Sequence, residues 1–294
     1  MFAIITMNDQ RFHDDKHGMI ICVIAFSLPG NIPVYTSSLL IALGVSLGLW
    51  WISQQKTYRL ANAQVSAGLW FLAGALAGAR AVHVIVDWGY FQDHLLEIFQ
   101  FQLGGLSWPG AIIGAVLGLL LYLRLMNKPF GQISDAMVPL MGLLAISVWL
   151  GCWFDGCAYG SMTSAWWGIP SRDEWGLSHP RVPLQLLGAT LTIAVFWVLD
   201  RFAHRLKLKP GTLFGLTSLG LCLLLLIASL LRADPAPEWK GLRLETYAGF
   251  LLTGLALATV AGINFRIIGS WFTQPTRQKG ASLPDREPHK DRAL

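Results

Sequence analysis

Seven long apolar stretches constrain the fold more than any other feature of this sequence. A helix needs about 20 residues to cross a hydrocarbon core about 30 Å thick, and each stretch is about that long. They lie near residues 33–53, 65–88, 106–126, 134–154, 182–200, 211–231 and 246–268. Only 13% of the residues are charged, about half the share usual in soluble domains. The predicted fold class is therefore an all-α integral membrane protein with seven transmembrane helices.

The two ends of the chain are expected to differ from this helical core. Residues 1–32 read as a polar N-terminus with a short interfacial or re-entrant apolar segment, because the run Met19–Leu28 holds only ten residues and ends at a Pro-Gly turn. Residues 33–268 are predicted to form the seven-helix membrane domain. Residues 269–294 are polar, basic and proline-containing, which favours a disordered cytoplasmic tail.

The distribution of lysine and arginine predicts the orientation. The loops after the first, third and fifth stretches, with the C-terminal tail, hold fourteen of these residues, and the opposite side holds seven. Cytoplasmic segments carry the excess of such residues, so the N-terminus is predicted outside and the C-terminus in the cytoplasm. We interpret the net charge of +5 as topology and contact with lipid headgroups, not as nucleic-acid binding.

The second stretch contains three ionisable residues at helical spacing. Arg80, His83 and Asp87 share one face in the outer half of the predicted helix. An arginine at membrane depth costs about 3 kcal/mol unless it is paired or hydrated, so this face should point into the bundle or a water-filled cleft. Two interpretations remain open: Arg80 belongs to a functional site, or it pairs with Asp87 or with carbonyl groups of a neighbouring helix.

Two further patterns concern packing. Gly110, Gly114 and Gly118 recur at four-residue spacing, which predicts a close approach between helices. The aromatic and slightly acidic segment 89–105 is expected to lie along the membrane interface. The four cysteines contain no CxxC motif and are interpreted as small apolar fillers. They are Cys22, Cys152, Cys157 and Cys222.

The stretch 148–160, VWLGCWFDGCAYG, leads from an apolar run into the longest polar excursion of the chain. Side chains at such a junction can meet both lipid and aqueous substrates. Four charged residues on four different elements are predicted near the outer face: Arg80, Asp155, Arg181 and Arg232. Their convergence predicts a site for an anionic phospholipid headgroup, with Asp155 and Arg80 as candidate catalytic residues. We expect no metal and no organic cofactor.

The order of motifs resembles that of bacterial prolipoprotein diacylglyceryl transferases along most of the chain. The motifs are Gly-Ala-Arg at 78–80, Gly-Gly-Leu-Ser at 104–107, the glycine frame of 148–160, Arg-Val-Pro-Leu-Gln at 181–185, and Gly211 followed by Arg-Ala-Asp at 232–234. The resemblance implies a multi-pass protein of the bacterial plasma (inner) membrane. It also implies transfer of a diacylglyceryl group from phosphatidylglycerol to a lipobox cysteine thiol of a preprolipoprotein, with glycerol phosphate leaving. The headgroup-binding residues it implies are Arg80, Gly104, Gly105, Tyr159, Arg181, Gln185 and Arg232.

The sequence departs from the family at polar positions. Trp149 and Leu225 stand in place of arginines. Gly188 and Ser229 stand in place of glutamates, and Pro109 takes the place of a histidine. Two interpretations therefore remain beside each other: a transferase with a rebuilt site, and a family member that binds phospholipid or a partner protein without the reaction. A small-molecule transporter is a weaker third, because no internal repeat is visible.

Overall fold

The computed structural model describes residues 24–28, 32–55, 61–101, 104–173, 176–206 and 208–272. Within these ranges, seven helical segments are long and apolar enough to cross a membrane, which confirms the seven predicted spans. The start of the chain, 1–23, lies outside the described residues. Of the predicted disordered tail 269–294, residues 269–272 continue a helix and residues 273–294 lie outside the described residues.

The helix bounds fall within a few residues of the apolar stretches. The spanning helices are α1 (Thr36–Gln54), α2 (Ala61–Val86), α4 (Trp108–Leu125), α5 (Phe130–Ala136) with α6 (Val138–Asp155), α7 (Leu184–Leu206), α8 (Thr212–Leu231) and α9 (Leu244–Phe272). The fourth span is divided because Pro139, in the first turn of α6, has no N–H to continue the hydrogen bonding of α5. The other spans are single helices.

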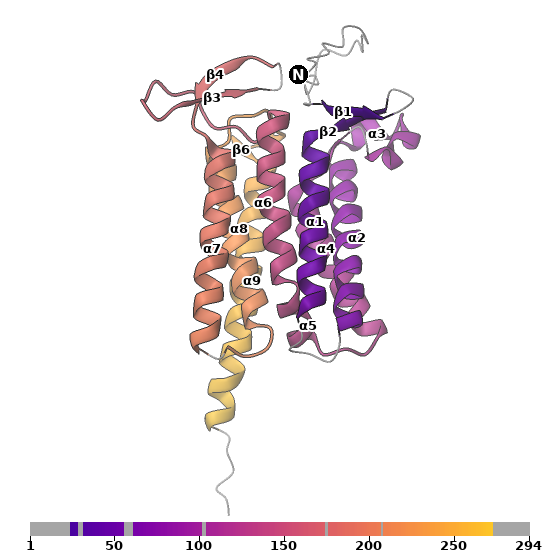
Figure 1. Ribbon diagram of the computed structural model, residues 1–294, viewed down its shortest axis with the longest axis vertical. Coiled ribbons are helices and arrows are strands. Elements are labelled where there is room, and N and C mark those ends of the chain that lie inside the picture. Colours follow the sequence, from indigo (N-terminus) through magenta and orange to yellow (C-terminus); the bar gives the residue numbers. More distant parts are fainter. Residues whose placement is uncertain are drawn as a thin grey trace, which may run out of the picture.

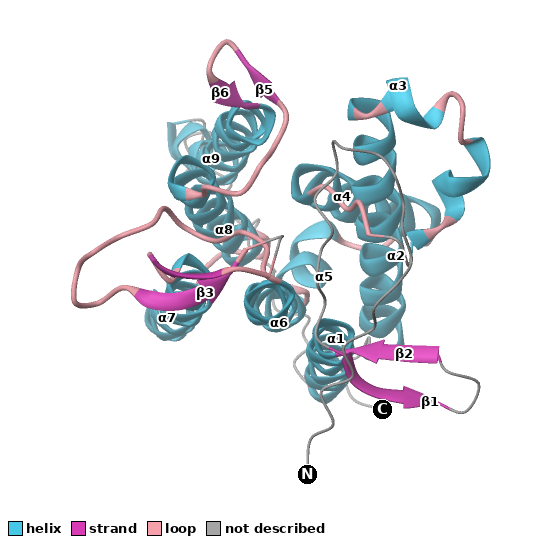
Figure 2. Ribbon diagram, turned by 90° about the horizontal axis from the view of Figure 1, so that it is seen from above, coloured by secondary structure: helices cyan, strands magenta, loops and turns pink. Residues whose placement is uncertain are grey.

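The bundle has two halves that α1 and α6 connect, with smaller contacts between α4 and α9 and between α5 and α8 (Figures 1 and 2). In one half α2 packs against α4, and in the other α7, α8 and α9 follow one another. The pair α1 and α6 joins them, since α1 packs along α6 and α6 packs against α7. Residues on α2 and residues on α8 or α9 therefore belong to different sides of the molecule.

Glycines allow the backbones of α2 and α4 to touch. A Cβ atom at Gly74 would collide with the carbonyl oxygen of Gly114, and one at Gly78 would collide with that of Gly110. A Cβ atom at Gly118 would meet the carbonyl oxygen of Trp70. The close packing predicted from the glycine spacing on α4 is confirmed, and α2 supplies the matching glycines.

Three antiparallel hairpins lie at one end of the bundle, which we call the hairpin end (Figure 1). They are β1 (Ile24–Leu28) with β2 (Ile32–Tyr35), β3 (Ile169–Arg172) with β4 (Ser178–Arg181), and β5 (Glu238–Trp239) with β6 (Leu242–Arg243). The described part of the short N-terminal apolar run is thus strand β1. The described residues 88–101 lie at the same end and form α3 (Trp88–Phe91) and the 3-10 helix η1 (Leu95–Phe99).

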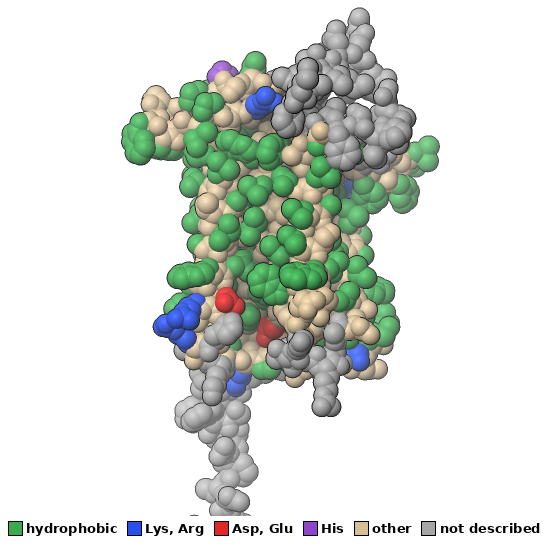
Figure 3. All heavy atoms as spheres, in the orientation of Figure 1, with side chains coloured by type: hydrophobic (Ala, Val, Ile, Leu, Met, Phe, Trp, Pro, Cys, Tyr) green, Lys and Arg blue, Asp and Glu red, His purple; other side chains and the backbone are tan. Residues whose placement is uncertain are grey.

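The outer surface between the two ends is apolar. In Figure 3 hydrophobic side chains cover most of the visible face, and the coloured charged groups lie toward the two ends. Ile85 and Trp197, for example, are each 70% exposed. The buried core includes Ile52, Leu119 and Leu140, which come from α1, α4 and α6. This pattern fits a bundle whose outer face meets lipid tails.

Candidate functional site at the hairpin end

Arg80 lies near the end of α2 and is buried, with 5% of its surface exposed. Its Nε donates to the carbonyl oxygen of Ile98 at 2.9 Å, and its Nη1 donates to those of Gly104 and Gly105 at 2.6 and 3.2 Å. Its Nη2 donates to the carbonyl oxygens of Glu97 and Gln100. A guanidinium has five N–H groups, so these five carbonyls engage all of them. We call Arg80 and its five partner residues the Arg80 group.

The two glycines are needed for this arrangement. Gly104 and Gly105 have φ angles of +84° and +73°, in the left-handed region that favours glycine. A Cβ atom at Gly105 would collide with the imidazole of His83 and the guanidinium of Arg80. Asp87 pairs with His83, whose Nδ1 lies 3.0 Å from the Asp87 Oδ2. Of the local partners considered for Arg80, the structure therefore shows the carbonyl groups, and they come from the loop after α2.

Arg181, at the end of β4, belongs to a second buried arrangement. Its Nη2 lies 3.1 Å from the Asp173 Oδ2, and both side chains are less than 10% exposed. The guanidinium also lies over the ring of Tyr159, 4.3 Å from the ring centre. Gln185, in the first turn of α7, donates from Nε2 to the carbonyl oxygen of Cys157 at 2.8 Å. These contacts hold the loop after α6 against the β3–β4 hairpin and α7.

Cys152 and Cys157 form a disulfide across the end of α6, with Cα atoms 4.7 Å apart. The interpretation of these two cysteines as apolar fillers is therefore wrong. Gly156, between them, has a φ angle of +69° and ends the helix. The turn brings the two thiols together although they are not a CxxC pair. Asp155 is the last residue of α6 and is half-buried.

Backbone pairing connects this loop to the segment after α8. Gly160 and Arg232 form an isolated antiparallel bridge. The N–H of Ala233 donates to the carbonyl oxygen of Tyr159 at 2.9 Å. The segment 158–160 and the Arg-Ala-Asp segment 232–234 are thus neighbours, although they are more than 70 residues apart in sequence.

Arg232 is the centre of a charged cluster. It pairs with Asp234 through two of its nitrogens, and its Nη1 donates to the Glu245 Oε2 at 2.9 Å. Arg243 donates from Nη1 to the Asp234 carbonyl oxygen at 2.7 Å and from Nη2 to the Asp234 Oδ1 at 3.2 Å. We call Arg232, Asp234, Arg243 and Glu245 the Arg232 group.

The pKa values of two members show how tightly the charges are coupled. Burial alone would raise the pKa of Asp234, but the hydrogen bond and charge of Arg232 and the charge of Arg243 lower it below its usual range. Burial alone would lower the pKa of Arg232, and the hydrogen bond and charge of Asp234 with the charge of Glu245 raise it instead. Both groups therefore stay ionised at neutral pH.

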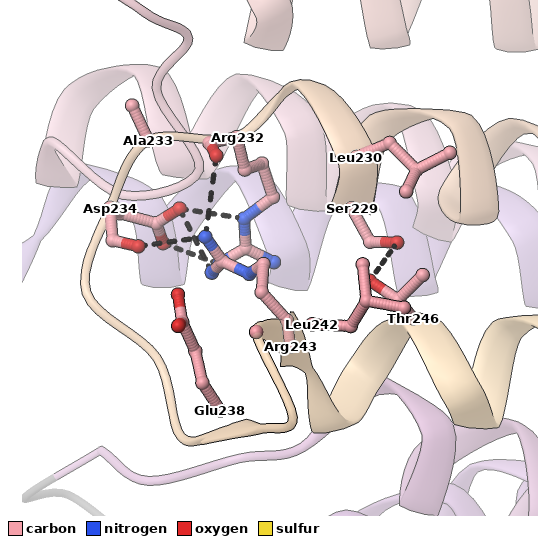
Figure 4. Close-up of a pocket in the computed structure, with 10 residues that line it drawn as sticks. Ser229, Leu230, Arg232, Ala233, Asp234, Glu238, Leu242, Arg243 and Thr246 are labelled. Atoms are coloured by element: carbon pink, nitrogen blue, oxygen red, sulfur yellow. Dashed lines mark hydrogen bonds and ion pairs between the residues drawn. The ribbon is translucent and has the colours of Figure 1, made fainter.

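A polar cavity of about 260 Å³ adjoins the Arg232 group (Figure 4). Its lining comes from the end of α8, the β5–β6 hairpin and the start of α9. The residues are Ser229, Leu230, Arg232, Ala233, Asp234, Glu238, Gly241, Leu242, Arg243 and Thr246. Ser229 and Thr246 hydrogen-bond to each other at 3.1 Å. Cations, carboxylates and hydroxyls thus face one space at the end of two spanning helices.

The predicted site residues divide into two sets. Arg80, Gly104 and Gly105 form one set in the half that contains α2 and α4. Tyr159, Arg181, Gln185 and Arg232 form the other, in the half that contains α7 to α9. The loop after α2 supplies the hydrogen-bond partners of Arg80, and the convergence of Arg80 with the other charges around one hollow stays a prediction. Asp155 lies on α6 itself.

Two charged residues that contact the second set were not singled out from the sequence. Arg243 and Glu245 join Arg232 only because the β5–β6 hairpin turns the chain back on itself. The available signal was the density of charge in the short connection between the last two spans. Six charged residues stand there: Arg232, Asp234, Glu238, Lys240, Arg243 and Glu245. Such crowding at a helix end favours mutual pairing.

Apolar side chains occupy positions where the family resemblance places polar ones. Trp149 is buried in a cluster with Leu184 and Leu224, and Leu225 packs against this cluster. A Cβ atom at Gly188 would collide with the indole of Trp149, so the tryptophan fills the space beside this glycine. Trp149 and Gly188, which replace an arginine and a glutamate of the family, thus pack against each other without any charged group.

Comparison with known proteins identifies the family. The sequence model described as prolipoprotein diacylglyceryl transferase matches residues 23–273. A protein of Thermosynechococcus vestitus is 27% identical over 90% of this chain and 98% of its own length, and one of Legionella pneumophila strain Lens is 30% identical over 84% and 94%. Both are named phosphatidylglycerol–prolipoprotein diacylglyceryl transferase. The chain therefore belongs to the prolipoprotein diacylglyceryl transferase family.

Proposed function

We propose that this multi-pass membrane protein transfers a diacylglyceryl group from phosphatidylglycerol to the lipobox cysteine thiol of a preprolipoprotein. The observation that carries the proposal is the family match, which covers all seven spans from residue 23 to residue 273. The relatives named above carry this donor and acceptor in their names. Glycerol phosphate is then the leaving group.

The contacts between motifs support the proposal. The Gly-Ala-Arg motif meets the Gly-Gly-Leu-Ser motif through Arg80 and Gly104. The Arg-Val-Pro-Leu-Gln motif meets the loop after α6 through Gln185 and Cys157. That loop meets the Arg-Ala-Asp motif through the bridge between Gly160 and Arg232. The segments that carry the resemblance are thus brought together in pairs by the fold.

The proposed setting is the bacterial plasma (inner) membrane, with the N-terminus outside and the C-terminus in the cytoplasm. The excess of lysine and arginine at the end opposite the hairpins supports this orientation. The hairpin end is then the outer face. A lipobox cysteine delivered to the outer face meets the protein at the end that carries the cavity.

The reaction needs a base for the thiol and cations for the departing phosphate. We assign the base to Asp155, at the end of α6, and the phosphate contacts to Arg232 and Arg243 at the cavity. Arg181 and Gln185 hold the loop that follows Asp155, and Arg80 positions the loop after α2. Trp149 and Leu225 stand where the family resemblance places arginines, and both are apolar here. In the proposed arrangement the cations therefore come from the segment between α8 and α9.

A second function, phospholipid binding without transfer, is favoured by the Trp149–Gly188 contact. An indole packed on a glycine supplies neither a cation nor a base, and the loss of one preorganised charged group commonly costs 10²–10³ in rate. A scaffold that keeps its frame and its cavity can still bind lipid. The two functions share the fold and differ in whether a covalent product forms.

The experiment that separates them is complementation with a biochemical readout. Cells depleted of their own transferase receive this gene, and the purified full chain receives phosphatidylglycerol vesicles and a lipobox peptide. Transfer predicts rescue together with glycerol phosphate release that Asp155→Asn abolishes and Asp93→Asn, at an exposed position, leaves intact. Absence of both rescue and release, together with retained binding of phosphatidylglycerol vesicles by the purified chain, would support the binding function instead.

A further inference from the structure

The loop that leads into β3, residues 161–168, projects sideways beyond α7 at the hairpin end (Figures 1 and 2). Its sequence is SMTSAWWG, and we call it the tryptophan loop. Trp166 is 95% exposed, and Met162 and Trp167 in the same loop are exposed as well. Large apolar side chains that gather on an exposed projection indicate an interaction surface.

The base of the tryptophan loop is held by the end of β4. The N–H of Thr163 donates to the carbonyl oxygen of Pro180 at 3.0 Å. The N–H of Val182 donates to the carbonyl oxygen of Ser161 at the same distance. The loop therefore continues the β3–β4 hairpin as a pairing segment, and its position is fixed relative to β4.

The tip of the loop is a hydrogen-bonded turn with two tryptophans at its centre. The N–H of Gly168 donates to the carbonyl oxygen of Ala165 at 2.9 Å, and Trp166 and Trp167 are the two residues between them. Turns favour glycine, proline, asparagine, aspartate and serine at such positions. Formation of the turn therefore does not require the indoles, and Trp166 in particular is not there to fill a core.

The chain around the tip carries no charge. No charged residue and no histidine stands between Asp155 and Arg172 in the sequence. A partner recognised by its charge would find no complementary group on the tip. An indole has a large apolar ring and one N–H donor, which suits the boundary between acyl chains and water.

The lipid-facing side of α7 begins beside this loop. Helix α7 starts at Leu184, three residues after β4 ends at Arg181. Leu187 and Leu191, in its first turns, are 43% and 53% exposed. In Figure 3 hydrophobic side chains continue from the bundle onto the projection. Since acyl chains cover the exposed face of α7, the headgroup layer of that leaflet lies next to the start of α7, where the loop extends.

We propose that the tryptophan loop is an interfacial anchor whose two indoles enter the headgroup layer of the bilayer at the hairpin end. The partner is the lipid surface itself, and no particular headgroup charge is needed. Because the loop is bonded to β4, the anchor fixes the height of the β3–β4 hairpin, and with it Arg181, above the membrane plane. This role goes beyond the proposed transfer reaction and does not depend on it.

The test compares two exposed serines at opposite ends of the hairpin. Ser164 lies in the tryptophan loop, and Ser178 begins β4. The variants Ser164→Cys and Ser178→Cys, in a full chain that carries Cys22→Ser and Cys222→Ala, receive a nitroxide label without reductant, so that the disulfide at the end of α6 remains. The labelled proteins are placed in vesicles of phosphatidylcholine, with and without phosphatidylglycerol.

Electron paramagnetic resonance then measures collisions of each label with oxygen, which concentrates in lipid, and with a water-soluble nickel complex. We expect the label at position 164 to be several-fold less accessible to the nickel complex than the label at position 178, in both kinds of vesicle. Equal accessibility of the two labels to nickel overturns the proposal. Protection at position 164 that requires phosphatidylglycerol overturns it as well.

Variants of the tip locate the effect. Trp166→Asp places a charge at an exposed position, so the fold is retained, and we expect the label at position 164 to become accessible to nickel. Leu177→Asp makes a similar change at an exposed residue near the other end of the hairpin and should leave the label at position 164 protected. Protection that survives Trp166→Asp overturns the proposal.

The same labels separate two other partners. Protection at position 164 that appears only when a lipobox signal peptide is added assigns the loop to the acceptor and overturns the anchor. Spin–spin broadening that grows with the ratio of protein to lipid assigns it to a second copy of the chain and also overturns the anchor. Protection without peptide, and at every ratio of protein to lipid, supports the lipid surface as the partner.

Discussion

Arg80 and Arg232 both lie near the hairpin end, but their hydrogen-bond partners are of different kinds. Arg80 is surrounded by five uncharged carbonyl oxygens of one loop. Arg232 is bound to two carboxylates, and a polar cavity lies beside it. The first arrangement holds a loop with no N–H left over. The second arrangement pairs Arg232 with carboxylates beside a polar cavity that a ligand could enter.

We propose, on the basis of their partners, that Arg80 is structural and that Arg232 belongs to the functional site. A ring of carbonyls engages every donor and leaves nothing for a ligand. Carboxylate partners from separate segments balance the charge of Arg232 and engage only one N–H of each of its Nη atoms. Replacing residues in each group tests this difference.

The largest effect is expected from Arg80→Ala. Several carbonyls of the Arg80 group would lose a charged donor, so we expect a loss of unfolding free energy on the order of 4 kcal/mol. Thermal unfolding of the detergent-solubilised chain measures it, and Arg124→Ala, at an exposed position on α4, is the control. A variant of near-normal stability that had lost all lipid binding would reverse the roles assigned to the two arginines.

Arg232→Gln should lower the rate of transfer more than it lowers the stability of the protein. Loss of this cation disrupts the cavity that contacts the phosphate, and we expect about a 100-fold fall in glycerol phosphate release. The rate of release from phosphatidylglycerol vesicles with a lipobox peptide is the measurement. Arg172→Gln, on the exposed side of β3, should retain the rate. Equal rates in the two variants would remove the Arg232 group from the site.

Replacing both Cys152 and Cys157 by serine should have a smaller effect. The disulfide closes a loop of only six residues, so its chain-entropy contribution is about 2 kcal/mol. Unfolding of the double variant and of the wild-type chain, each with and without reductant, measures it. Reductant should destabilise the wild-type chain alone. A response in the double variant as well would assign the effect to another cause.

The smallest effect is a dependence on pH confined to the Arg232 group. The pKa of Asp234 is lowered in the folded protein, so its stabilising contribution is present above its unfolded pKa of about 3.9 and is lost as the pH falls through the lower folded value. Asp234→Asn should therefore be less stable than wild type at pH 7, and the gap should close below about pH 4. The carbonyls around Arg80 do not titrate, so Arg80→Ala should show a constant gap over the same range.

Much of the fold could be predicted because membrane helices leave strong local signals. The length and spacing of the apolar stretches predicted all seven spans, and the glycines of α4 predicted a close helix contact, whose partner the structure shows to be α2. Asp155 was correctly placed near the junction at the end of α6, because a run of apolar residues stops there. The partners of side chains were harder to predict. Arg80 was considered with Asp87 or with carbonyl groups of a neighbouring helix, whereas its partners are carbonyl groups of the loop after α2.

The sequence by itself determined the number of spans and the family. The length of an apolar stretch and the order of motifs depend only on the order of residues along the chain. Only the tertiary structure decided which side chains contact each other. Arg243 joins Arg232 through a hairpin, Cys152 joins Cys157 across a helix end, and Trp149 packs on Gly188 from a neighbouring helix. The physical reason is that electrostatic and packing energies depend on distances in space, and these are set only when α6 to α9 pack together.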